Sequence, residues 1–348
     1  MSVIPNSHEV LLRNRNHLSG KIAIIGASSP ALLTGLATGG LIISDHAGYA
    51  DTLAGHSGWQ VCFGYCPDAV QGGSYHTVVI FVPKARAELD LRLTFAKWLA
   101  VAGGTLILIG EKREGIAGAV KQLKNYASNA EKVDSARHCQ VWRANNIEPL
   151  KEFELAKWLL WHSVASSDVS VEVAGLPGIF SHGQLDEGTA VLLKTLAETP
   201  VKARRILDFA CGAGVIGAWL QAWQQKQGHI PAIVDGVDVQ FQAVTCARAT
   251  YDRSGATGNI TASDGLAGVE GVWPAIVSNP PFHTGIKTDI SIVENFLRDV
   301  SRHLEPRGEL RLVANSFLPY ELLIKRFIGP VERLYEDSRF IVYRAFRR

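Results

Sequence analysis

The segment from Ser278 to His283 reads Ser-Asn-Pro-Pro-Phe-His, and its residue types can hold a planar amino group. The lone pair of such an amine is delocalised into the adjacent π-system, so the nitrogen is a poor nucleophile until its hydrogens are held. The Asn279 side chain and the Pro280 carbonyl offer two acceptors, the two prolines restrict the backbone, and Phe282 offers a face for a flat ring. We therefore predict a catalytic set for methyl transfer to an amino group, formed by Asn279, Pro280, Pro281 and Phe282.

Positioning alone is enough to explain catalysis by such a set. Holding two reactants in line can lower a barrier by about 7–11 kcal/mol, whereas a general base adds a factor of about 10²–10⁴ in rate. A dedicated base is therefore dispensable. Taken by itself, the Asn-Pro-Pro tripeptide that begins at Asn279 is explained equally well as a turn after a buried strand, so the surrounding elements decide.

An apolar run at 205–209 leads into a glycine-rich turn and then a helical pattern. This succession is typical of the first strand, loop and helix of a nucleotide-binding α/β sheet. Gly212 and Gly214 let the backbone approach a ligand closely, as a methionine moiety or a pyrophosphate would each require. The sequence therefore predicts a ligand-binding loop after the first strand.

Two acidic residues follow the next apolar runs. Asp238 lies near the end of the run 230–239, where a carboxylate can accept hydrogen bonds from both ribose hydroxyls. Asp264 follows the next short run, where its carboxylate can meet an adenine amino group. A further strand at 275–278 delivers Asn279 to the carboxyl edge of the sheet, where ligands of open α/β sheets bind.

The glycine pattern also matches a dinucleotide-binding fingerprint. Gly212, Gly214 and Gly217 have the required spacing, and Asp235 and Asp238 lie at about the expected distance. A nicotinamide enzyme, however, needs no Asn-Pro-Pro-Phe after its fourth strand. The order of acid, glycine-rich loop, two further acids and Asn-Pro-Pro-Phe therefore predicts S-adenosylmethionine as the ligand.

The chain resembles the bacterial 16S ribosomal RNA guanine-N2 methyltransferases over nearly its whole length. The segments that carry the resemblance are 133–137, 176–181, 185–188, 211–215, 278–283 with Gly285, and 308–320. The last of these, together with Asn-Pro-Pro-Phe-His, separates the chain from adenine-N6 and glutamine-N5 enzymes, which more often carry Tyr after the prolines. The resemblance implies an α/β fold of two tandem Rossmann-like class I methyltransferase domains.

The resemblance also implies roles for single residues. Asp208 lines the donor, Asp238 holds its ribose, and Asn279 holds the guanine. The loop 176–188 closes over the donor, although it could equally be a connector from sequence alone. Ala210 stands where relatives usually have glycine, and its methyl group narrows the loop without closing it. The full set expected to bind the cofactor is Asp208, Ala210, Gly212, Gly214, Asp238, Asp264 and Asn279.

The first half of the chain repeats the pattern of the second. The segments 21–27, 78–83, 103–109 and 140–144 correspond in order to 205–211, 275–281, 308–313 and 341–345. The first half has Phe81, Val82, Pro83 and Lys84 in place of the catalytic segment, and its turn at 26–30 lacks Gly-x-Gly. We therefore expect the first domain to be degenerate. Two generic α/β domains that share a strand periodicity are the alternative.

Domain limits follow from a polar linker near 145–150. Residues 1–150 are expected to form the degenerate domain, for RNA binding or structural support, and residues 151–348 the catalytic domain. Helices are expected at 151–163 and at 189–197.

Composition fits a globular chain. With 348 residues, of which 47% are hydrophobic and 20% charged, both domains can bury a core. A net charge of +2 is weak support for RNA binding, because phosphate contacts need clustered Lys and Arg. Candidates for such clusters are Lys202, Arg204, Arg205, Arg302, Arg307, Arg311, Arg339, Arg344, Arg347 and Arg348, although a solvated surface is preferred for most of them.

Other features bear on compartment and partners. Five unevenly spaced cysteines and a start without a secretory signal predict the reducing cytoplasm. His56, Cys62, Cys66 and His76 lie close together, but their spacing matches no standard zinc site, so we expect no metal. The uncharged stretch 22–44 is long enough to span a membrane, but its glycines and proline predict strand, turn, helix and strand. We therefore expect no membrane contact, and a monomer.

The expected reaction begins with a guanosine flipped out of folded 16S rRNA. The base stacks on Phe282 while Asn279 and Pro280 hold its N2, and the methyl group passes in line from the sulfonium. His283 contacts RNA, receives the released proton or, preferably, caps the loop. The resemblance implies an assembled small ribosomal subunit as substrate. The alternatives are an adenine-N6 or glutamine-N5 methyltransferase, and an rRNA-binding assembly factor whose methylation is incidental.

Overall fold

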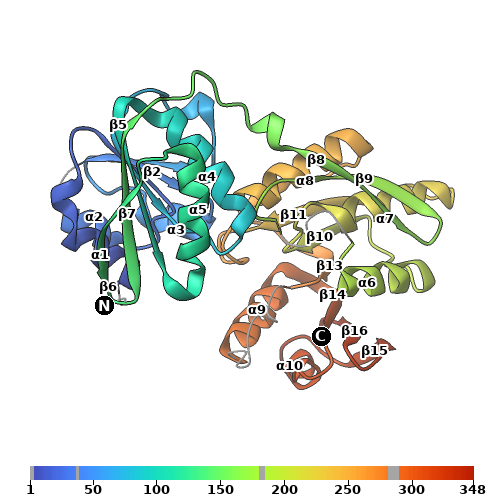
Figure 1. Ribbon diagram of the computed structural model, residues 1–348. Helices are drawn as coiled ribbons and strands as arrows, with labels where there is room; N and C mark the ends of the chain where they lie inside the picture. The colour runs from blue at the N-terminus through green and yellow to red at the C-terminus, as the bar shows by residue number, and fades with distance from the viewer. Residues whose placement is uncertain (1–3, 37–38, 180–184, 281–289) are drawn as a thin grey trace. The chain divides into compact units, whose positions relative to one another are not determined.

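The computed structural model describes residues 4–36, 39–179, 185–280 and 290–348. Within them the chain divides into two compact units, Met1–Trp158 and Leu159–Arg348 (Figure 1). The division predicted at residue 150 lies in the linker that precedes this point.

The first unit is built on a seven-stranded sheet with the strand order β3-β2-β1-β4-β5-β7-β6. Its strands are β1 (Ile22–Ile25), β2 (Gly40–Ser44), β3 (Trp59–Phe63), β4 (Tyr75–Phe81), β5 (Ala100–Glu111), β6 (Glu131–Ala136) and β7 (Cys139–Ile147). Its helices are α1 (Asn6–Arg13), α2 (Pro30–Leu36), α3 (Ala47–Leu53), α4 (Arg86–Leu99) and α5 (Ile116–Tyr126). The helices α1 and α2 pack together on one side of the sheet, and α4 and α5 on the other (Figure 1).

The second unit has a seven-stranded sheet with the order β12-β11-β10-β13-β14-β16-β15. Its strands are β10 (Arg205–Phe209), β11 (Ile233–Asp238), β12 (Ile260–Ala262), β13 (Trp273–Ser278), β14 (Leu304–Asn315), β15 (Val331–Glu336) and β16 (Phe340–Phe346). Its helices are α6 (Glu187–Glu198), α7 (Val215–Lys226), α8 (Phe241–Ser254), α9 (Ile290–His303) and α10 (Tyr320–Phe327). The strands β10 to β14 are parallel, and β16 is antiparallel to both of its neighbours.

The two sheets have the same topology. In each, the first strand lies at the centre, the second and third extend to one side, and the fourth, fifth, seventh and sixth extend to the other. The antiparallel strand β7 corresponds to β16, as the matching sequences at 140–144 and 341–345 predict. The internal repeat and the α/β fold of two tandem domains are confirmed.

Alternation along the central strands determines which helices face the site. Leu207 and Phe209 of β10 join the core beneath α9 and α10. Ile206 of β10 and Val277 of β13 join the core beneath α6 and α7. Because successive side chains of a strand point to opposite faces, Asp208 and Asn279 lie on the α6 side of the sheet.

The prediction of a helix at 151–163 is wrong, whereas the helix predicted at 189–197 is confirmed as α6. Residues Leu160–Ser166 form β8, which pairs with β9 (Val169–Gly175) in a hairpin. The hairpin turn, Ser167 and Asp168, has positive φ at both positions, a conformation that favours a two-residue hairpin connection. Alternating valines at 169, 171 and 173 are buried against the core. This alternation is a strand signal, and it outweighs the helical period read from 151–163.

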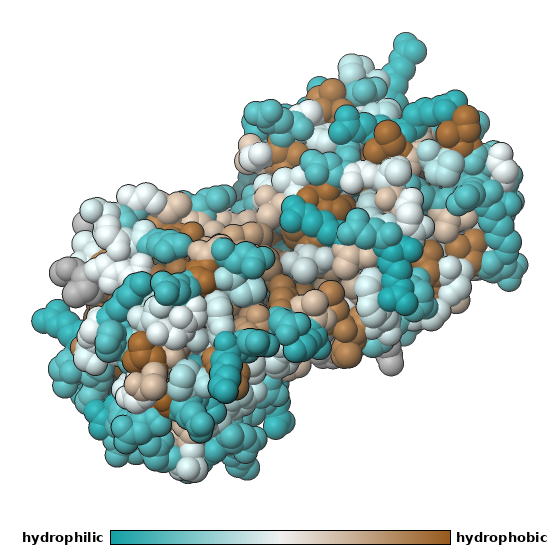
Figure 2. Space-filling view, turned by 90° about the horizontal axis from the view of Figure 1, so that it is seen from above, coloured by the Kyte–Doolittle hydropathy of each residue, from teal (hydrophilic) through white to brown (hydrophobic). Residues whose placement is uncertain are grey.

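The uncharged stretch 22–44 forms β1, α2 and β2, as its glycines and proline predict. In the described part of the chain, no helix is both long enough and apolar enough to cross a membrane. The face seen in Figure 2 is mostly hydrophilic, with hydrophobic residues in patches between hydrophilic ones.

Candidate functional site

The predicted cofactor residues gather at the carboxyl edge of the second sheet. Asp208 lies in β10, Asp238 ends the neighbouring β11, and Asp264 follows β12. Asn279 follows β13, which pairs with β10 on its other side. Since these strands are parallel, their carboxyl ends meet at one edge, where open α/β sheets bind ligands.

The loop after β10 needs left-handed backbone at three positions. The φ angles are 57° at Ala210, 53° at Gly212 and 79° at Gly214. A Cβ atom on Gly214 would lie 3.1 Å from the Cα of Ala247 and from Cε1 of Tyr251, so this turn packs directly against α8. Glycine meets both demands without strain. Ala210 is therefore strained, a cost that the sequence analysis missed when it considered only the width of the loop.

Asp238 holds the glycine loop in place. Its Oδ2 accepts a hydrogen bond of 2.9 Å from the Gly212 N–H, and its Oδ1 accepts one of 3.0 Å from the Gln240 N–H. A carboxylate can accept about four hydrogen bonds. The same side chain can therefore anchor the loop and still accept from a ligand hydroxyl.

Asp208 is fully buried, and neither of its carboxylate oxygens has a hydrogen-bond partner among the described residues. Burial, and next the negative charge of Asp238, raise the pKa of Asp208 well above its usual value. Buried polar groups without a partner are rare and costly. A donor or cation bound at this edge would satisfy Asp208, so its position fits a ligand site.

The Asn279 side chain is held by α6. Its Nδ2 donates to Asp186 Oδ2 over 2.7 Å and to Thr189 Oγ1 over 2.9 Å. A carboxylate oxygen only accepts hydrogen bonds, so the atom beside Asp186 must be the amide nitrogen. The side-chain oxygen of Asn279 remains available as an acceptor, which is the role predicted for it.

The loop between β9 and α6 touches the site from both ends. The carbonyl of Gly178 accepts a hydrogen bond of 3.2 Å from Gln240 Nε2, just after Asp238. At the other end, Asp186 bonds to Asn279. Residues 180–184 within this loop lie outside the described residues, as do the predicted Pro281, Phe282 and His283. Pro280 is described and buried.

Other candidates are engaged elsewhere. Asp235, the second acid of the dinucleotide pattern, accepts hydrogen bonds from Arg205, Trp273 and the Asn259 N–H, so it braces the sheet. Burial and nearby carboxylates raise the pKa of Cys211 well above its usual value, which fits the packing role expected for it.

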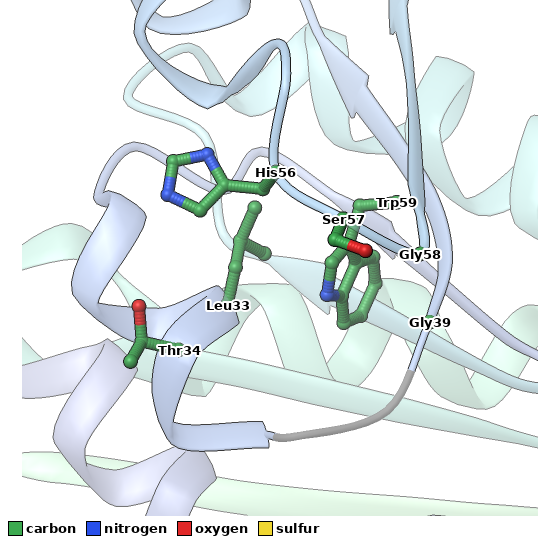
Figure 3. A pocket seen from close by; sticks show the side chains of 7 residues that line it. All are labelled: Leu33, Thr34, Gly39, His56, Ser57, Gly58 and Trp59. Carbon is green, nitrogen blue, oxygen red and sulfur yellow. The ribbon is translucent and has the colours of Figure 1, made fainter.

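Each of the two histidines noted in the first unit has a hydrogen-bond partner in the backbone. His56 bonds to the Leu53 carbonyl, and His76 accepts from the Lys21 N–H. The described residues contain no group of three or more His, Cys, Asp or Glu that could hold a metal ion. A hollow of about 360 Å³ lies between α2 and the residues that lead into β2 and β3, and is lined by Leu33, Thr34, Gly39, His56, Ser57, Gly58 and Trp59 (Figure 3). It lies toward the amino ends of these strands, opposite to the edge at which parallel sheets bind ligands.

Five of the candidate basic residues are paired with carboxylates in the described part of the chain. Arg311 is fully buried and pairs with Glu309, so the suggestion that it contacts RNA is wrong. Arg205, Arg302, Arg339 and Arg344 pair with Asp235, Asp299, Glu187 and Glu332. The solvated surface preferred from the sequence fits these four, and the structure adds their ion pairs.

Two residues that orient the site were not predicted as site residues from the sequence. Asp186 and Thr189 lie in or beside the segment 185–188 that carried the family resemblance, but no role was predicted for them. The sequence Asp-Glu-Gly-Thr is an N-cap signal before an apolar helix. It locates the start of α6 but not the contact with Asn279, which is 93 residues away in the chain.

Comparisons with known proteins agree with this architecture. The model of the methyltransferase small domain matches residues 170–344, and that of its N-terminal domain matches residues 8–162. A ribosomal RNA small subunit methyltransferase C from Hahella chejuensis is 40% identical over 352 residues and covers 100% of both chains. The protein of the same name from Pseudomonas aeruginosa strain LESB58 is 40% identical over 341 residues, covering 97% of this chain and 98% of its own.

A solved structure is similar over almost the whole chain. The T. thermophilus 16S rRNA N2 G1207 methyltransferase, in complex with AdoMet and guanosine, superposes with a TM-score of 0.84 and covers 99% of this chain and 92% of its own. Its sequence identity is 23%, so the likeness concerns the fold.

Proposed function

Because the chain belongs to the ribosomal RNA small subunit methyltransferase C family, it is an S-adenosylmethionine-dependent rRNA methyltransferase, and we propose that it methylates the exocyclic N2 of a guanosine in 16S rRNA. The observation that carries transfer to an amino group is the Asn279 side chain, whose nitrogen is bound within the protein and whose oxygen is left to accept. Such an oxygen suits an amino group, which has hydrogens to donate. The choice of guanine N2 follows from the family.

The described residues fit S-adenosylmethionine. The buried Asp208, without a partner in the described residues, suits the positively charged methionine end of the donor. The left-handed turn at Gly212 and Gly214 brings backbone close to the ligand, and Asp238 suits the ribose. Asp264 is exposed after β12, where an adenine amino group could be met. When bound, S-adenosylmethionine supplies the methyl group from its sulfonium.

The protein's own residues then hold the guanine. Asn279 accepts one hydrogen of N2, the Pro280 carbonyl the other, and Phe282 provides the stacking face. Holding both hydrogens aims the nitrogen lone pair at the methyl group, which is positional catalysis. After the transfer one N2 hydrogen leaves as a proton to solvent water. The proposed role of His283, which lies outside the described residues, is structural and not that of a base.

The wider assignment follows the same reasoning. The substrate is the small ribosomal subunit, and the protein acts as a monomer in the cytoplasm. We propose that the first domain, predicted from the sequence as residues 1–150, is degenerate and serves RNA binding or structural support, and that the second, predicted as residues 151–348, is catalytic. The T. thermophilus neighbour is a G1207 methyltransferase, so the equivalent guanosine is the first candidate target.

The test is transfer of labelled methyl from S-adenosylmethionine to small subunits and to free 16S rRNA, both from a strain that lacks the gene. We expect N2-methylguanosine in the subunit. Asn279→Ala should lower kcat by at least 100-fold and leave the donor Kd within about threefold. N6-methyladenosine as product would overturn the proposed function, and unchanged turnover of Asn279→Ala would overturn the role assigned to Asn279.

A further inference from the structure

The orientation of the Asn279 amide is set from outside the catalytic segment. We propose that Asp186 is a positioning residue for methyl transfer, which fixes the Asn279 oxygen toward the substrate amine. This inference rests on the proposed function, because it concerns the same site.

Asn279 has two partners, but only one of them selects its orientation. The Thr189 hydroxyl, 2.9 Å from Nδ2, can either donate or accept, so it would tolerate a flipped amide. Asp186 Oδ2, 2.7 Å from Nδ2, can only accept. In a flipped amide two oxygens would face each other, and the substrate amine would meet an NH₂ group. Asp186 therefore excludes the unproductive orientation.

Asp186 is itself fixed by its place at the N-cap of α6. The same Oδ2 accepts a hydrogen bond of 2.9 Å from the Thr189 N–H. A side chain at Gly188 would lie 3.1 Å from Asp186 Oδ2 and 3.4 Å from Asn279 Nδ2, so the helix start packs tightly against both. The Oδ2 atom of Asp186 therefore caps the N-terminus of α6 and also orients the Asn279 amide.

The far end of α6 is also tied to the sheet. The buried Arg311 of β14 donates to the Thr199 carbonyl over 3.0 Å and is held by Glu309. The strand β14 pairs with β13, and Asn279 directly follows β13. Both ends of α6 are therefore hydrogen-bonded to residues on neighbouring strands of one sheet. The helix therefore holds Asp186 at a constant position relative to Asn279.

Two substitutions separate the two tasks of Asp186. Asp186→Ser keeps a good N-cap for α6 but is too short to reach Asn279, and we expect kcat to fall about 10- to 100-fold, the usual effect of losing a hydrogen bond with a charged group. Asp186→Asn retains a carbonyl oxygen for both contacts, so it should restore kcat to within about threefold of the parent. Neither should change the donor Kd by more than twofold.

The control is Glu198→Gln, which removes a carboxylate from the other, exposed end of α6 and should leave kcat unchanged. The decisive measurement is a double-mutant cycle, since a residue that acts through Asn279 has nothing to add once Asn279 is gone. Asp186→Ser should therefore lower kcat in the parent but not in Asn279→Ala.

The outcomes are distinguishable. Unchanged kcat in Asp186→Ser, or an equal loss in the Asn279→Ala background, overturns the positioning role while the proposed function stands. Loss of donor binding or of folding in Asp186→Ser, with no rescue by Asp186→Asn, also overturns it in favour of a structural role. Full activity of Asn279→Ala overturns the role proposed for Asn279, whereas a product other than N2-methylguanosine overturns the proposed function itself.

Discussion

The carboxyl edges of the two sheets differ in what occupies them. In the first unit, the turn after β1 lies against Arg92, and a Cβ atom on Gly26 would collide with Nη1 of this arginine. Arg92 also donates to the Phe81 carbonyl at the end of β4 and to Asp45 just after β2. In the second unit, the acid at this edge, Asp208, has no partner among the described residues.

The helix that precedes each sheet repeats the contrast. His8 is the third residue of α1, and it accepts from the Ser28 N–H in the turn while its ring stacks on Phe81 at 4.4 Å. Thr189 is the third residue of α6, and it accepts from Asn279. Phe81 and Asn279 occupy the same place at the end of the fourth strand. The two equivalent helices therefore have different roles. Helix α1 fills the edge of the first sheet, whereas α6 orients a functional group at the edge of the second.

The two units show how the carboxyl edge of a sheet can be filled by side chains while the fold stays the same. A buried charge must be paired, and the first unit pairs Arg92 with Asp45 and Glu88 inside the protein. The second unit leaves a buried carboxylate to be satisfied from outside. For the degeneracy predicted for the first domain we propose a physical form, which is occupation of the edge by the domain's own His8 and Arg92.

The largest effect is expected from removing the arginine. Arg92→Met leaves the Asp45 carboxylate buried without its cation, which should cost about 3–5 kcal/mol in the free energy of unfolding of the first unit. Burial raises the pKa of Glu88 to about 8, so this side chain is mostly neutral at pH 7 and contributes less to the cost. Burial alone would raise the pKa of Asp45, but the Arg92 charge holds it well below its usual value. The Asp45 carboxylate is therefore the group that loses the most stabilisation when Arg92 is removed.

Hydrogen exchange of the β4 amides would measure this cost for the first unit separately. The matched control is Arg86→Met on the exposed face of the same helix, which should change stability by less than about 0.5 kcal/mol. If both substitutions cost the same, Arg92 is not what closes this edge.

The second effect concerns His8 and pH. Burial lowers the pKa of His8 from 6.5 to about 4, so the folded state keeps it neutral while the unfolded chain takes up a proton as the pH falls. Stability of the first unit should therefore decrease between about pH 6.5 and pH 4, by about 3 kcal/mol in total. Because His8 is almost fully buried, solvent screening removes little of this effect.

Glutamine at position 8 can accept from the Ser28 N–H without titrating. His8→Gln should therefore remove this part of the pH dependence, while substitution of the exposed His138 by Gln should not. The measurement is exchange of the β4 amides at pH 7 and pH 4.5 in each variant. An identical pH profile in the parent and in His8→Gln would show that His8 is not responsible.

Local patterns predicted the elements of the site better than its contacts. The sequence predicted three features of the site: the glycine spacing, the acid at the end of β11 and the Asn after β13. Each of them lies next to an apolar run whose end marks the sheet edge. The contacts of Arg92 with Asp45, and of Asp186 with Asn279, join residues 47 and 93 positions apart. Such pairings depend on packing, and a single sequence does not encode them as a local pattern.

The smallest effects concern one backbone position that both units share. Gly26 has φ of 87° and Ala210, its counterpart, has φ of 57°. A non-glycine residue in this region costs about 1–2 kcal/mol, while glycine costs about 0.5–1 kcal/mol in chain entropy. Ala210→Gly should therefore stabilise the second unit by about 0.5–1 kcal/mol.

The reverse exchange should act in the opposite direction. Gly26→Ala should destabilise the first unit by about 2 kcal/mol or more, because it adds a collision with Arg92 to the backbone strain. Gly115→Ala is the control for strain alone, since φ is 82° and a Cβ atom there would meet nothing within 4 Å. Urea unfolding of each variant gives the three values. If Gly26→Ala costs no more than Gly115→Ala, then Arg92 moves aside easily, and the first unit's edge is less firmly closed than its contacts indicate.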